Sequence, residues 1–67
     1  MTPLVDLMLK HNTTISDVVQ EIGVDEQTVM EWCTGIGVPN AKTAISMAAC
    51  IGCELKELYL AIIRTRR

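Results

Sequence analysis

The two glycines that bracket residues 24–34 limit the fold of this chain more than any other feature. Apolar residues with helical spacing come before Gly23 and resume after the turn, and only Val24 and Asp25 lie between the two patterns. A glycine ends a helix readily because it adopts the left-handed conformation, and an aspartate caps the free N–H groups of a new helix. We therefore expect two short helices joined by a tight turn at Asp25, the second of which ends at Gly35.

The second of these helices has one buried side and one outward side when its residues are spaced 100° apart. If Val29 points inward, Trp32 and Cys33 do so too, and the opposite side is left exposed. The outward side consists of Gln27, Glu31 and Thr34, and Thr28 and Met30 lie on its flanks. This arrangement is typical of a helix-turn-helix, whose second helix enters the major groove of DNA.

Capping signals predict where the helices before this turn begin. Thr2 precedes Pro3, a residue that fits the first helical turn without losing a hydrogen bond, so we expect a helix from Pro3 to about His11. Thr14 with Asp17 three residues later resembles a capping box, which starts the helix that ends at the turn.

Two more helices follow the turn. Asn40 is a good N-cap for a fourth helix that stops at Gly52, and a fifth is expected over residues 55–63. The residues expected to point inward are Ala41, Ala44, Met47, Ala48 and Ile51 in the fourth helix and Leu55, Leu58, Tyr59 and Ile62 in the fifth. The sequence thus predicts an all-α domain of five helices over residues 1–63, followed by a basic tail at residues 64–67.

The composition fits one small domain without a membrane segment. The chain has 67 residues, of which 49% are hydrophobic and only 3% aromatic, so aliphatic side chains must build its core. It contains no run of roughly 20 apolar residues, the length needed to span a bilayer. Its start lacks the basic region and apolar run of a secretory signal. We therefore expect a cytoplasmic protein whose three cysteines are free thiols.

From Gly23 onward the chain resembles the lambda-repressor/Cro type of helix-turn-helix domain, the XRE-like family. The residues that carry the resemblance are Gly23, Val24, Thr28, Val29, Trp32, Gly35, Pro39, Ala48, Gly52 and Leu58. The resemblance implies a compact five-helix DNA-binding domain with the helix-turn-helix at its second and third helices. It also implies a transcriptional regulator similar to the small Cro-like proteins of phages and prophages, which act as homodimers on paired half-sites of double-stranded DNA.

Two departures from this family concern its contacts to phosphates. The second helix begins with Thr14 and Ile15, where the family frequently has a glutamine that binds a phosphate, and the loop carries Ile36 and Val38, where basic residues are usual. Phosphate contacts then fall to the free N–H groups at the starts of the second and fourth helices. The side chains expected to assist are Thr14, Ser16, Asn40 and Lys42.

Gln27 is the first candidate for contacting a base, because a glutamine amide pairs with both N6 and N7 of adenine. Glu31, one turn later, is placed to accept from the N4 of a cytosine. The full set of residues expected at the DNA interface is Thr14, Ser16, Asp25, Gln27, Thr28, Met30, Glu31, Thr34, Asn40 and Lys42.

The alternative interpretation is that these are ordinary solvated side chains on an exposed face. The stretch that would enter the groove carries Asp25, Glu26 and Glu31 and no lysine or arginine. This opposes the electrostatic attraction that dominates DNA affinity. A basic tail of Arg64, Arg66 and Arg67 would add positive charge only if it reached the duplex. The net charge of −2 predicts weak, strongly salt-dependent binding to random DNA.

The fifth helix is apolar on almost every side over residues 59–63, which is typical of an association surface. We expect a symmetric homodimer with Tyr59, Leu60 and Ile63 at the interface, extended by the loop that holds Ile36 and Val38. The alternative is that these residues are scattered exposed aliphatic side chains that form no interface. A different functional class is also open: a protein-interaction module that keeps the helix-turn-helix fold but binds a repressor or a polymerase subunit instead of DNA.

Cys50 and Cys53 form a CxxC motif that, with Cys33 and His11, would supply four zinc ligands. One CxxC is a weak signal, and buried thiols that act as small hydrophobic groups explain the cysteines more simply. We therefore expect no metal and no cofactor. We expect His11 to cap the C-terminal end of the first helix. The chain also offers no set of nucleophile, base and orienting residue, so we do not expect an enzyme.

Overall fold

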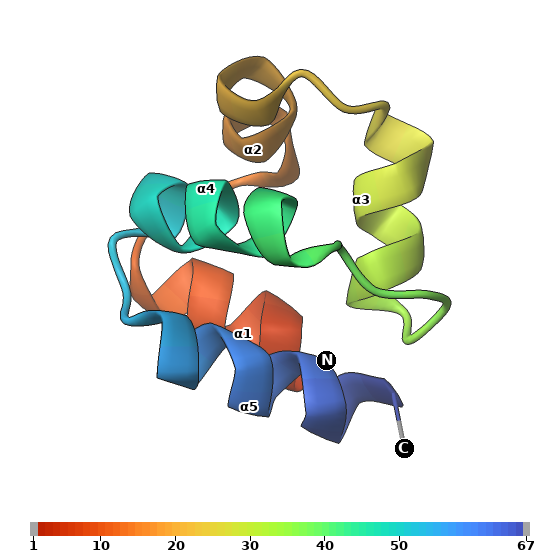
Figure 1. Cartoon of the computed structure of the whole chain (residues 1–67), viewed down its shortest axis with the longest axis vertical. Coiled ribbons are helices and arrows are strands. Elements are labelled where there is room, and N and C mark those ends of the chain that lie inside the picture. The colour runs from red at the N-terminus through yellow and green to blue at the C-terminus, as the bar shows by residue number, and fades with distance from the viewer. Residues whose placement is uncertain (1, 67) are drawn as a thin grey trace.

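The computed structural model describes residues 2–66 and arranges them as five helices (Figure 1). The helices are α1 (Pro3–Lys10), α2 (Ile15–Ile22), α3 (Glu26–Cys33), α4 (Ala41–Ile51) and α5 (Leu55–Arg66). The described part of the chain contains no strand, so the predicted all-α fold of five helices is confirmed. Within these residues, no helix has both the length and the apolar character that crossing a membrane requires.

Three of the helices begin with the side-chain caps that the sequence predicts. The Thr2 hydroxyl accepts a hydrogen bond from the first turn of α1, which starts at Pro3. The N–H of Thr14 donates to Asp17 Oδ2 at 2.9 Å while the N–H of Asp17 donates to Thr14 Oγ1 at 3.1 Å, so the capping box of α2 is complete. The side chain of Asn40 accepts a single capping hydrogen bond from the N–H of Thr43 at the start of α4. These local bonds satisfy backbone donors that a helix cannot satisfy itself.

The turn between α2 and α3 differs from its prediction in one respect. Gly23 ends α2 in the left-handed conformation at φ 80°, as expected. Asp25 has the extended backbone of an N-cap, but its side chain makes no capping hydrogen bond. The position of Asp25 as N-cap is therefore confirmed, and only the predicted hydrogen bond from its exposed side chain is wrong.

Each helix contributes one large side chain that is completely shielded from water. These five residues are Leu4, Val18, Val29, Met47 and Leu58. Trp32 and Cys33 pack beside them, which confirms the predicted inward side of α3. Because the helices are too short to be stable alone, this shared core holds α3 in place.

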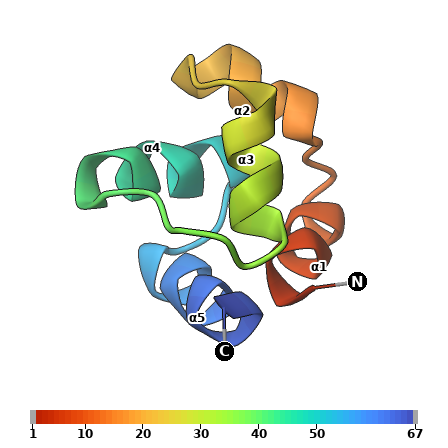
Figure 2. The same cartoon turned by 90° about the vertical axis from the view of Figure 1, so that its right-hand side faces the viewer.

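The helices form two groups around this core. Helices α1 and α5 lie side by side, and α2 packs against α3 and α4 (Figures 1 and 2). The backbone N–H of Leu4 donates to Thr65 Oγ1 at 3.0 Å, so the start of α1 meets the end of α5 and the two helices run antiparallel. Figure 2 shows α3 at the front of the molecule, with the starts of α2 and α4 on either side of it.

Helix α5 is longer than predicted. The expected end at Ile63 is wrong, because the helix continues through residues 64–66. Thr65 explains the extension: its hydroxyl accepts from the N–H of Leu4 and donates at 2.7 Å to a carbonyl one turn earlier in α5. Most of the expected basic tail is therefore the last turn of a packed helix, and Arg67 lies outside the described residues.

Two residues expected on inward sides are exposed instead. Tyr59 follows Leu58 by 100° around α5, and Leu58 takes the core position. Ala41 lies in the first turn of α4, where Ala44 is the first buried residue. Both corrections concern residues at the edge of an apolar stripe, and the exposure of Tyr59 leaves it available to a partner.

Candidate nucleic-acid interface

The outward side of α3 is open to solvent. Gln27, Met30 and Thr34 are exposed, and Met30 keeps 45% of its surface accessible. Thr28 and Glu31 are half-buried. Met30, which was predicted on the flank, is therefore more exposed than Glu31, which was predicted to face outward. No other part of the described chain covers Gln27, and the side chain proposed to contact a base is accessible.

Gln27 and Glu31 are coupled across one helical turn. The amide nitrogen of Gln27 lies 3.5 Å from Glu31 Oε2, at the long limit of a hydrogen bond. Such a contact between exposed groups is weak, since water competes with it. The structure thus brings together the two predicted base-contacting residues, in an arrangement that a base could replace at little cost.

Thr34 has a structural role as well as an exposed position. Its hydroxyl is directed at the backbone carbonyls of Met30 and Glu31, at 3.2 and 3.0 Å, and helps to end α3. The hydroxyl proton is therefore occupied, and only the oxygen lone pairs remain available to a ligand.

Four residues predicted to contact phosphates lie at the starts of α2 and α4. Thr14 Oγ1 and the side-chain oxygen of Asn40 accept capping hydrogen bonds from their own helices. Each cap uses an oxygen as acceptor, so the hydroxyl proton of Thr14 and the amide protons of Asn40 can still be donated. Ser16 and Lys42 are exposed beside them. The two helix starts lie on either side of α3 in Figure 2, where the strands of a groove would pass.

The charges on this face are predominantly acidic. Asp25 and Glu26 are exposed at the start of α3, and α2 and α3 together contain no lysine or arginine. Glu26 was not among the residues expected at the DNA interface, although its position directly after the turn places it at the exposed start of α3. If this face meets DNA, the groups available to phosphates are mainly neutral donors and helix N-termini, together with Lys42.

The cysteines show no features of a reactive or metal-binding site. Burial raises the pKa of the Cys33 thiol, and burial together with the nearby Glu21 and Asp17 carboxylates raises that of Cys50. Burial and a neighbouring carboxylate likewise raise the pKa of Cys53. Because the thiolate is the reactive and metal-binding form, these shifts disfavour both chemistries. In the range 2–66 no three histidine, cysteine or acidic side chains are grouped as a metal site would need.

Comparison with known proteins agrees with this geometry. A family model described as Helix-turn-helix matches residues 4–58. The SPbeta prophage-derived uncharacterized HTH-type transcriptional regulator YotL of Bacillus subtilis (strain 168) is 32% identical over 63 residues, which make up 92% of this chain and 79% of that protein. No solved structure matches the chain.

Proposed function

The chain belongs to the helix-turn-helix family, and from this premise we propose that it is a sequence-specific DNA-binding regulator of transcription that acts in the cytoplasm. The observation that carries the proposal is the open side of α3, where Gln27 is exposed on a helix held by the domain core. Placed in the major groove, Gln27 would contact adenine and Glu31 would accept from cytosine. Bound at a promoter, the protein would act by blocking access of the polymerase.

We further propose a homodimer that binds two half-sites. Tyr59, Leu60 and Ile63 are exposed on α5, with 40% of Leu60 and 64% of Ile63 accessible to solvent. Exposed aliphatic side chains in one place usually mark an association surface. A dimer would place two copies of α3 about 34–36 Å apart, one turn of DNA, which is the spacing of paired half-sites.

The proposal is tested by selecting bound duplexes from a random pool. We expect one sequence family to emerge and to bind at least about a thousand times more tightly than random DNA at physiological salt. Binding to random DNA should be weak and should weaken further with added salt, because salt ions compete with the contacts between charged side chains and phosphates. A pool without enrichment after repeated rounds would contradict DNA reading by this protein.

Replacing Gln27 with alanine should remove the preference at one base pair of the selected site. A lost bidentate contact is worth about 1–3 kcal/mol of discrimination at that position, and the fold should survive because the side chain is exposed. The measurement is a repeat of the selection with the variant. Gln20→Ala, which alters an exposed glutamine on α2, is the matched control and should select the original sequence. An unchanged site with Gln27→Ala would refute the assignment of this residue.

Replacing Leu60 with glutamate should convert the dimer to monomers. A carboxylate buried between two copies would be left without a partner, and its twin would lie close to it across the two-fold axis. Sedimentation should show half the wild-type mass. Leu9→Glu is the control: Leu9 is 54% exposed on α1, outside the proposed interface, and its replacement should leave the mass unchanged. A dimer that tolerates Leu60→Glu does not use this surface.

The acidic charge of α3 favours a second candidate function. Asp25, Glu26 and the exposed Met30 together present an anionic surface with an apolar side chain, which suits a basic protein partner better than a phosphate backbone. In this alternative the domain binds a repressor or a polymerase subunit. The selection experiment separates the two classes, because an interaction module enriches no duplex.

A further inference from the structure

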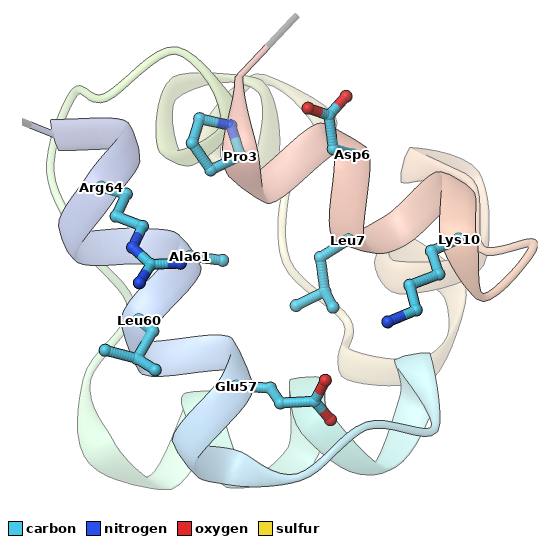
Figure 3. A pocket seen from close by; sticks show the side chains of 8 residues that line it. All are labelled: Pro3, Asp6, Leu7, Lys10, Glu57, Leu60, Ala61 and Arg64. Carbon is cyan, nitrogen blue, oxygen red and sulfur yellow. The ribbon is translucent and has the colours of Figure 1, made fainter.

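A groove runs between α1 and α5 on the surface of the domain (Figure 3). Apolar side chains line it, among them Leu7 and Leu60. Four charged side chains line it as well: Asp6 and Lys10 from α1, and Glu57 and Arg64 from α5. None of these four is joined to another by an ion pair in the part of the chain that the structure describes. The groove therefore offers both apolar surface and charges of both signs to a partner.

The charges on α5 are placed symmetrically about the middle of the groove. Glu57 and Arg64 are seven residues apart, so they lie on one side of the helix at a separation of about 10 Å. The midpoint between them falls between Leu60 and Ala61, both of which also line the groove. A second α5 laid antiparallel across this midpoint would therefore bring each Glu57 opposite the partner's Arg64.

The charges on α1 would also meet opposite charges of a second copy. Because α1 and α5 run antiparallel, Arg64 shares one end of the groove with Pro3, and Glu57 faces Leu7 and Lys10 toward the other end (Figure 3). A two-fold axis across the middle of both helices would therefore also bring Asp6 toward the partner's Lys10. Every charge that lines the groove then meets its opposite.

We propose that the occupant of this groove is a second copy of the same chain, whose α5 lies antiparallel on α5 with Glu57 paired to the partner's Arg64. This inference rests on the homodimer proposed above and specifies its register. The exposed Leu60 and Ile63 would supply the apolar contact, and the ion pairs at both ends would select one alignment. An arrangement with α5 over the partner's α1 also pairs opposite charges, but it leaves Ile63, on the far side of α5, outside the contact.

Charge reversal tests the register. Glu57→Arg or Arg64→Glu alone replaces two attractive pairs by two repulsive ones, because the interface is symmetric. We expect each single variant to raise the dissociation constant of the dimer by at least about tenfold, measured by sedimentation equilibrium. The double variant Glu57→Arg/Arg64→Glu restores opposite charges across the interface and should return the constant to within about threefold of wild type.

The matched control is Arg66→Glu. Arg66 lies in the same last turn of α5 as Arg64 but does not line the groove, so it reports the effect of reversing a charge at the C-terminal end of this helix. We expect it to leave the dissociation constant unchanged. Circular dichroism of every variant distinguishes loss of the dimer from loss of the fold.

The outcomes separate this inference from the proposal beneath it. If the wild-type chain is monomeric at all concentrations, both the homodimer and its register fail. If Leu60→Glu dissociates the dimer but the double variant stays as weak as the single ones, the register is overturned while the homodimer stands. A dimer unaffected by Glu57→Arg and Arg64→Glu also overturns the register. Neither result bears on DNA reading, which the duplex selection tests separately.

Discussion

Replacing Gly35 with alanine should lower the free energy of unfolding by about 2–5 kcal/mol. Gly35 has a φ of 90°, and a side chain there costs about 1–2 kcal/mol because left-handed backbone crowds the Cβ atom. The added Cβ would also lie 2.8 Å from the backbone oxygen of Thr65. That oxygen belongs to the packed last turn of α5 and cannot rotate away, so overpacking adds about 1–3 kcal/mol.

Gly37 in the same loop provides the control for this experiment. Its φ is 72°, but nothing lies within 4 Å of a Cβ atom added there. Gly37→Ala should therefore show only the backbone penalty of about 1–2 kcal/mol. Urea denaturation of both variants at one protein concentration measures the difference. Equal losses at Gly35 and Gly37 would mean that the backbone of Thr65 does not lie close enough to Gly35 to exclude a side chain there.

Replacing Leu4 with alanine should cost about 2–5 kcal/mol, because the side chain is completely buried and leaves a cavity. A domain of this size is expected to have only several kcal/mol of total stability, so the variant should be close to unfolding at ambient temperature. Leu9→Ala makes the same chemical change on the same helix, and Leu9 is exposed. It should cost less than about 0.5 kcal/mol.

Thermal unfolding of both leucine variants, followed by circular dichroism at a fixed concentration, gives the comparison. The concentration must be held constant because dimer formation stabilises the folded state by mass action. If Leu4→Ala and Leu9→Ala unfold at the same temperature, the proposed position of α1 in the core is wrong.

The features that could be predicted from the sequence are those that depend on neighbouring residues. The capping box of Thr14 and Asp17 and the helix stop at Gly23 need only local bonds, and both are present. The inward side of α3 followed from helical spacing around Val29. The exposure of Gln27 then followed as well, since a helix buried on one side must expose the other.

The features that could not be predicted depend on contacts between distant parts of the chain. The end of α5 was placed too early because Thr65 is held by Leu4, 61 residues away in the sequence. The groove could not be predicted for the same reason. Glu57 and Arg64 line it only because α1 lies beside α5. The side-chain bond of Asp25 is absent for another reason: residue type alone does not decide whether an exposed carboxylate turns toward the backbone or toward solvent.

The close approach of Gly35 to Thr65 has a consequence for the choice of operators. It places the backbone just after α3 against the last turn of α5, the helix that carries the surface proposed for dimerisation. Two copies assembled through α5 would therefore hold their two α3 helices at a fixed distance from each other. Such a regulator would tolerate base changes within a half-site more readily than the insertion of a base pair between half-sites.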